Sequence, residues 1–170
     1  QLDTVATETA QWAQPFTVLL ERARTTYAPF AANTLASQRA LVRWYSERSH
    51  IMQAVTLARE WVVSWTCAAL GKDWIADREE VEAAINQASR QRRGEGVASS
   101  SSLLTHVMAL PNAALLMQTW DGINDLRNDT AHCGQRAKPR PTNSIVQAAM
   151  RLTEQLERLP LPQEDTPCSS

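Results

Sequence analysis

The sequence predicts an all-α protein, a helical bundle of about five to six helices. Apolar residues recur at helical spacing along nearly the whole chain. Alternating runs of the β-branched and aromatic residues that are typical of strands are absent. With 170 residues, 44% of them hydrophobic, the chain is long enough to bury one core and too short for two ordinary domains.

The first half of the chain contains three predicted helices. We expect one over residues 4–27, interrupted near Pro15 and ended by Pro29. Its apolar stripe comprises Trp12, Phe16, Leu19, Leu20 and Ala23. Asn33 is the expected N-cap of the next helix, over residues 34–49. Residues 49–71 then form the predicted central buried helix, which closes at Gly71. Its inward side chains, three and four residues apart, are Ile51, Val55, Ala58, Val62 and Trp65.

The second half contains shorter predicted helices, whose ends are marked by capping residues, glycine or proline. A polar helix is expected from Asp77 to about Arg93, followed by a flexible Gly- and Ser-rich loop over 94–102. Helix resumes at Leu103, breaks near Pro111, and restarts from Asn112 until Gly134. A basic loop over 135–144 leads to a final amphipathic helix over 144–159. Its inward side chains are Ile145, Ala149, Leu152 and Leu156.

The domain organisation follows from these segments. We expect one helical domain over residues 1–159 and a disordered tail over 160–170. The chain begins with Gln and shows no targeting signature, which predicts that the natural chain continues upstream.

Composition and charge exclude several classes of function. The net charge is −1, so any attraction for phosphate must come from local patches among the 15 Arg and two Lys. Three widely spaced cysteines argue against a disulfide framework, and no apolar run is long enough for a transmembrane helix. We therefore expect a cytoplasmic protein without a membrane partner. No nucleotide-binding motif and no acidic cluster suited to Mg²⁺ is visible, so no metal or cofactor is expected.

The candidate chemistry lies in the segment LRNDTAHCG, which begins at residue 126. An Arg, an imidazole and an amide at a helix end suit RNA cleavage without metal, in which the substrate's 2′-hydroxyl attacks the neighbouring phosphate. Arg127 supplies a permanent planar cation for the phosphorane, and His132 moves a proton near neutral pH. Asn128 is placed to orient the imidazole ring. These three residues are the predicted catalytic set.

The placement of these residues on a helix leaves alternatives open. Arg127 and His132 would lie about 140° apart on a continuous helix, so they share a face only if the helix ends between them. A polar stripe formed by Asp121, Asp125, Asn128 and His132 would instead face a cleft. A histidine at a helix end is also commonly a cap or a surface residue.

A basic loop directly follows the motif. Arg136, Lys138 and Arg140 bring positive charge to the place where a phosphate backbone would approach, and they are the predicted substrate-binding residues. A solvated loop is the alternative.

Other polar and aromatic residues are interpreted as structural. Arg59 and Glu60 lie in an apolar helix and predict a buried or interface ion pair. His50 and His106 are expected at the surface or at caps, and Cys133 is expected to be inert. Most of the six tryptophans have the spacing of core residues.

The motif resembles a known family. LRNDTAHCG is similar to the Arg-polar-x-x-x-His motif of HEPN domains, and AVTLAREWVVSW, over residues 54–65, resembles a helix of CRISPR-associated HEPN domains that typically follow a CARF sensor domain. The resemblance extends over roughly residues 30–158 and is specific only in the Arg-to-His motif. It implies an endoribonuclease active as a homodimer, with both copies of Arg127 and His132 in one composite site. It also implies an upstream CARF domain that responds to cyclic oligoadenylate, which this chain does not include.

The sequence therefore leads to two hypotheses for the function, a leading one and an alternative. The first is a metal-independent HEPN endoribonuclease that cleaves single-stranded RNA in CRISPR antiviral defence. The alternative is a non-catalytic helical domain for dimerisation or partner binding. Two-fold pairing would bring four functional side chains together, which favours a dimer for the first function.

Overall fold

The computed structural model describes residues 18–95, 101–131 and 140–162, and these residues form helices and no strand. The prediction of an all-α fold is confirmed. The chain divides into two compact units, Gln1–Asn33 and Thr34–Ser170.

In the first unit, residues 18–27 are helical and lead into a 3₁₀ turn, η1 (Ala28–Phe30). Pro29 lies in this turn, so the α-helix ends just before the proline as predicted. Leu19 and Leu20, from the predicted apolar stripe, are exposed. Pro15, Trp12 and Phe16 lie outside the described residues.

The second unit begins with helix α2 (Leu35–Glu47), which is capped by Thr34 and not by the predicted Asn33. The Thr34 hydroxyl accepts the Ser37 backbone N–H at 3.1 Å, and the Ser37 hydroxyl accepts the Thr34 backbone N–H at 3.1 Å. Such a reciprocal capping box satisfies two backbone donors, whereas Asn33 as the cap would have to start the helix one residue earlier.

Helix α3 (Ile51–Ala69) is the buried central helix that the sequence predicts. Val55, Ala58, Val62 and Trp65 are buried, and Ile51 is half-buried at the helix start. Gly71 ends the helix with a φ of 64°, a conformation that an L side chain adopts only at a cost. The Gly71 N–H donates to the Ala68 carbonyl at 3.1 Å and the Lys72 N–H to the Cys67 carbonyl at 2.8 Å, which is a Schellman cap.

The remaining helices agree with the predicted segments. They are α4 (Arg78–Arg92), α5 (Ser102–Ala109), α6 (Ala113–Ala131) and α7 (Thr142–Arg158). Pro111 separates α5 from α6, as expected from its missing N–H. The predicted end of α6 at Gly134 lies outside the described residues, as does most of the loop over 94–102.

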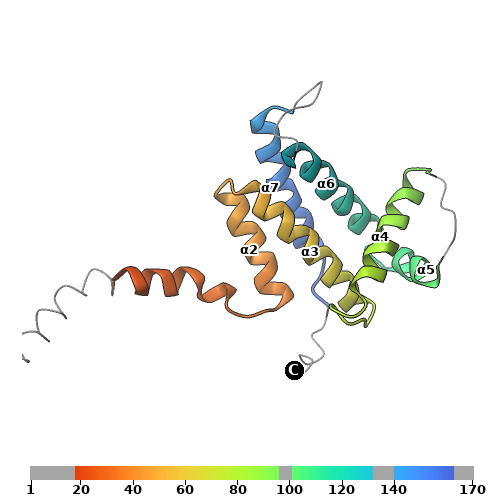
Figure 1. The fold of residues 1–170 in the computed structure, drawn as a ribbon, viewed down its shortest axis with the longest axis horizontal. Coiled ribbons are helices and arrows are strands. Elements are labelled where there is room, and N and C mark those ends of the chain that lie inside the picture. The colour runs from red at the N-terminus through yellow and green to blue at the C-terminus, as the bar shows by residue number, and fades with distance from the viewer. Residues whose placement is uncertain (1–17, 96–100, 132–139, 163–170) are drawn as a thin grey trace, which may run out of the picture. The chain divides into compact units, whose positions relative to one another are not determined.

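Four helices form the body of the second unit. Helix α2 packs against α3 and α7, and α6 packs against the same two helices from the other side (Figure 1). Helices α4 and α5 pack against each other, with α4 also against α3 and α6. The core holds large side chains from several helices, including Trp61, Leu116, Trp120, Ile123 and Leu156, all with no exposed surface.

The chain remains attached to the bundle beyond the end of α7. Leu159 is fully buried, and its carbonyl accepts a hydrogen bond from Arg39 Nη1 at 3.0 Å. The Pro160 carbonyl accepts the indole N–H of Trp65 at 2.8 Å. The predicted tail is thus anchored at its first residue, and residues 163–170 lie outside the described part.

Candidate active site

Arg127 and Asn128 lie on the last turns of α6 and are exposed. Earlier turns of α6 are buried in the core through Met117, Trp120, Ile123 and Leu126. Because α6 is fixed along its apolar face, the two polar side chains project from a rigid support. His132 follows directly after the last described residue of α6, so its position relative to Arg127 stays a prediction.

The predicted substrate-binding residues divide in the same way. Arg136 and Lys138 lie outside the described residues. Arg140 precedes α7, and its Nε lies 3.1 Å from Oδ2 of Asp129, a side chain that is 8% exposed. This ion pair ties the start of α7 to the last turns of α6. Arg140 therefore already faces a carboxylate next to Asn128, so less of its positive charge is available to a phosphate.

The polar stripe on α6 does not face a single cleft. Asp121 lies against the C-terminal end of α4, where its carboxylate accepts hydrogen bonds from Ser89, Arg92 and Arg93, the last at 2.8 Å. Asp125 and Asn128, further along the same stripe, are exposed. The prediction of one cleft-facing stripe is wrong for Asp121, because α4 packs over that part of α6.

A polar cluster between α3, α4 and α6 lies close to Arg127. Arg59 Nη2 pairs with Glu82, and Arg59 Nη1 donates to Asn124 Oδ1 at 3.2 Å. The Arg59 guanidinium carbon lies 4.4 Å from the ring centroid of Trp120. Asn124 is three residues before Arg127, so this cluster holds α6 about one turn before the candidate site.

Arg59 and Glu60 do not pair with each other. Glu60 pairs with Arg78 at the start of α4, while Arg59 pairs with Glu82 one turn later. The predicted ion pair is thus replaced by two ion pairs that join α3 to α4. The sequence signal was the presence of two charges in an apolar helix, but their partners lie 18 and 23 residues away.

The described part of the chain contains two histidines, His50 and His106, and one cysteine, Cys67. His50 is exposed at the start of α3 and stacks on Trp44, and Cys67 is buried. Burial raises the pKa of the Cys67 thiol from 9.0 to about 11, which disfavours the nucleophilic thiolate. Cys133 lies outside the described residues.

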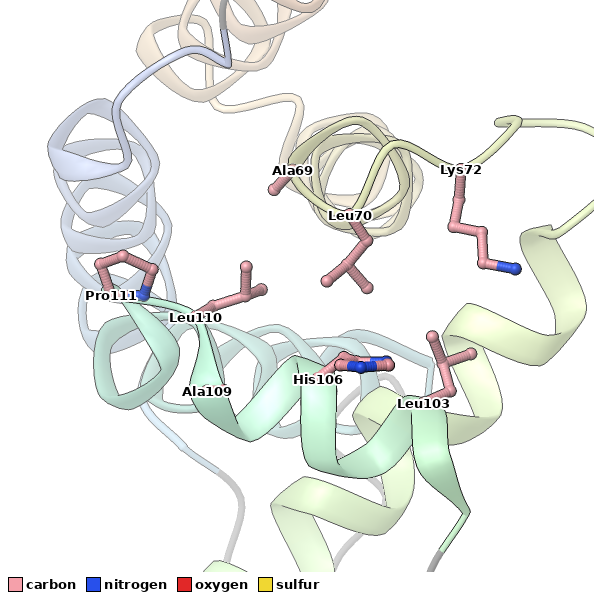
Figure 2. A pocket seen from close by; sticks show the side chains of 8 residues that line it. All are labelled: Ala69, Leu70, Lys72, Leu103, His106, Ala109, Leu110 and Pro111. Carbon is pink, nitrogen blue, oxygen red and sulfur yellow. The ribbon is translucent and has the colours of Figure 1, made fainter.

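His106 lines a pocket of about 360 Å³ between the end of α3 and α5 (Figure 2). The other lining residues are mostly apolar, with Leu70, Leu103 and Leu110 around the opening and Lys72 at its edge. Lys72 Nζ lies 3.7 Å from Asp77. Ala109, Leu110 and Pro111 of the lining directly precede α6, so the pocket lies near the start of α6, whereas Arg127 lies near its end.

Within the described ranges, no helix is both long and apolar enough to cross a membrane. The same residues contain no group of three or more His, Cys, Asp or Glu side chains arranged around a common metal position. The chain matches no known family model, and comparison with curated proteins and with solved structures gives no match either. A functional assignment therefore depends on the residues and their geometry.

Proposed function

We propose that this chain is a metal-independent endoribonuclease that cleaves single-stranded RNA. The observation that carries the proposal is the exposed position of Arg127 and Asn128 on the last turns of a core-anchored helix, just before His132 in the sequence. An exposed cation on a core-anchored helix, followed five positions later in the sequence by a residue that can transfer a proton, meets the main requirements of this reaction.

The proposed reaction forms a bond between the 2′-oxygen and the adjacent phosphorus and breaks the bond from phosphorus to the 5′-oxygen. The 2′-hydroxyl loses its proton, and the departing 5′-oxygen gains one. His132 moves a proton in this exchange, since imidazole titrates near neutral pH. Arg127 stabilises the phosphorane, whose negative charge exceeds that of the phosphodiester, and Asn128 orients the imidazole ring.

The resemblance to HEPN domains extends the proposal to partners. Two copies of the chain would form one composite site in a homodimer, with Arg127 and His132 from each copy. An upstream CARF domain would respond to cyclic oligoadenylate, and the protein would act in the cytoplasm in CRISPR antiviral defence. Arg136, Lys138 and Arg140 would contact the RNA backbone, with Arg140 also engaged by Asp129.

The deciding experiment is RNA cleavage by purified protein in EDTA, with analysis of the product ends. We expect 2′,3′-cyclic phosphate and 5′-hydroxyl ends, because the attacking oxygen belongs to the substrate. The matched control is His132→Ala from the same purification, which removes contaminating nuclease as an explanation. Strict dependence on added Mg²⁺, or 3′-hydroxyl ends, would contradict the proposal.

A non-catalytic dimerisation domain is the second candidate. The observation that favours it is the exposure of Val18, Leu19 and Leu20 on the helix of the first unit. Exposed apolar side chains on one helix are typical of contact surfaces. A concentration series in analytical ultracentrifugation, with Leu19→Asp/Leu20→Asp as the variant, tests this candidate. It is favoured if the dimer depends on these leucines and the protein leaves RNA intact.

A further inference from the structure

An exposed cluster of aromatic and basic side chains lies where α2 turns into α3. The guanidinium carbon of Arg48 lies 4.2 Å from the ring centroid of Trp44. The rings of Trp44 and His50 are stacked, with centroids 6.4 Å apart and planes inclined by 18°. Tyr45 meets both rings edge-on, at 5.3 Å and 6.2 Å. Arg48 and His50 are exposed, and Trp44 is half-buried.

The turn that carries this cluster is held by the backbone. The Ser49 N–H donates to the Ser46 carbonyl at 3.0 Å and the His50 N–H to the Tyr45 carbonyl at 2.9 Å, which is a Schellman cap. Arg48 Nη1 donates to the Trp44 carbonyl at 3.2 Å. The aromatic and cationic groups are therefore ordered before any ligand arrives, which lowers the entropy cost of binding.

The tryptophan of the cluster differs from the tryptophans of the core in its burial. Trp61, Trp65 and Trp120, in the described helices, are at most 3% exposed. Trp44 is half-buried. His50 is the N-cap residue of α3, yet its side chain makes no capping hydrogen bond.

The cluster lies at the same end of the bundle as the candidate active site. The Arg39 bond to Leu159 puts the start of α2 beside the end of α7, so the end of α2 points toward the start of α7. Arg140 and Asp129 join the start of α7 to the end of α6 at that same end. Figure 1 shows the α2–α3 turn, the end of α6 and the start of α7 on one side of the second unit.

We infer that the cluster formed by Trp44, Arg48 and His50 is a binding site for single-stranded RNA, in which a base stacks on the aromatic and guanidinium planes and Arg48 contacts a phosphate. The inference rests on the proposed ribonuclease function and names a second contact for its substrate. Stacked aromatic, imidazole and guanidinium planes accept an unpaired base of any sequence, and the adjacent cation favours a polyanion over a neutral peptide. Glu47 carries the opposite charge beside the cluster, with its Oε2 3.8 Å from Arg48 Nη1.

The test is binding of a fluorescent, fully 2′-O-methylated single-stranded oligonucleotide to the whole chain. This probe resists attack by a 2′-hydroxyl, so affinity is measured without cleavage. Trp44→Leu should weaken binding about 5- to 150-fold, the equivalent of about 1–3 kcal/mol per stacked base. Arg48→Gln should weaken binding and lower the slope of log affinity against log salt by about 0.7. Trp44→Phe should retain most of the affinity.

Matched controls lie far from the cluster. Trp74 is a half-buried tryptophan in the loop after α3, and Arg90 is an exposed arginine on α4. Trp74→Leu and Arg90→Gln should bind the oligonucleotide as the wild type does. If Trp44→Leu fails to fold, Arg48→Gln carries the test, because its side chain is exposed.

The outcomes separate this inference from the proposed function. Unchanged affinity in both Trp44→Leu and Arg48→Gln overturns the inference, even if the protein cleaves RNA. Failure of the wild type to bind the oligonucleotide overturns it as well. Binding that depends on Trp44 and Arg48 in a protein that cleaves no RNA supports the inference and removes the proposed ribonuclease activity.

Discussion

Replacement of Arg59 by Met tests whether Arg59 holds α6 in place beside the candidate site, as distinct from the residues that act in the site. Methionine keeps the unbranched stem of arginine and removes the guanidinium. Three contacts are lost: the ion pair with Glu82, the hydrogen bond to Asn124 at 3.2 Å and the stacking of the guanidinium on Trp120 at 4.4 Å. The side chains of Arg59 and Glu82 are 19% and 29% exposed, so water reaches this pair only in part.

The expected cost follows from these contacts. A hydrogen bond to a charged group contributes about 1.5–3 kcal/mol, and a cation over an aromatic ring about 0.5–2 kcal/mol. The contributions overlap because one guanidinium makes all the contacts, and solvent screening reduces the part from Glu82. We therefore expect Arg59→Met to lower the free energy of unfolding by about 2–3 kcal/mol.

The assay is urea unfolding followed by circular dichroism at 222 nm. The midpoint should fall while the slope stays constant, since the exposed area of the unfolded chain hardly changes. The double variant Arg59→Met/Glu82→Gln should cost less than the sum of the two single variants by about 1 kcal/mol, because each single variant leaves a partner behind. Arg90→Met, on an exposed side chain, is the matched control and should cost less than about 0.5 kcal/mol.

An unfolding free energy within about 0.5 kcal/mol of the wild type in Arg59→Met would refute this reasoning. Strict additivity of Arg59→Met and Glu82→Gln would refute it too, since it would mean that the two side chains do not interact in solution.

The remaining predictions concern the end of α6 and the buried thiol. Arg127→Ala and His132→Ala should each lower RNA cleavage by about 10²- to 10⁴-fold, and Arg127→Lys should rescue poorly because an ammonium lacks the planar fork; full activity in both alanine variants would show that the site lies elsewhere. The melting temperature of Arg127→Ala should stay near that of the wild type, because the side chain is exposed, and early melting would indicate a structural role. Asp129→Asn removes the carboxylate that faces Arg140 and should lower the free energy of unfolding by about 1–2 kcal/mol in chemical denaturation; no change would mean that the ion pair contributes nothing. In a chain whose other two cysteines are replaced by serine, Cys67 should react with Ellman's reagent at pH 8 only on unfolding, because burial raises its pKa to about 11; rapid reaction of the folded protein would contradict this. Because the raised pKa means that the folded state holds the proton more tightly, the contribution of Cys67 to stability should be complete below pH 9 and decline between pH 9 and 11, as measured by urea unfolding in that range.

The ends of the helices illustrate how far local chemistry determines structure. The Gly71 cap of α3 and the break at Pro111 were predicted correctly, because a positive φ and a missing N–H act within one turn of the chain. The cap of α2 was misassigned by one residue. Asn33 and Thr34 are both good N-caps, and Ser37, three residues after Thr34, completes a capping box with Thr34.

The candidate site is predictable in its residues and only partly in its geometry. Arg127 and Asn128 are exposed on a helix, as a motif that meets a polymer requires. The stripe through Asp121 had the correct helical periodicity, but periodicity does not indicate which neighbouring helix covers each segment of a face. Helix α4 supplies Arg92 and Arg93 to Asp121, and no local signal in α6 predicts that contact.

The sequence by itself determined the all-α class, the order of the helices and most of the apolar side chains that α3 and α7 contribute to the core, because apolar spacing, caps and prolines act over a few residues. Only the tertiary structure decided the partners of the charged side chains. Arg59 meets Glu82 and Asn124, which are 23 and 65 residues away, and Arg39 meets Leu159, 120 residues away. Such contacts depend on how α2, α3, α4, α6 and α7 pack. The apolar pattern of one helix does not determine which neighbouring helix supplies the partner of each of its charged side chains.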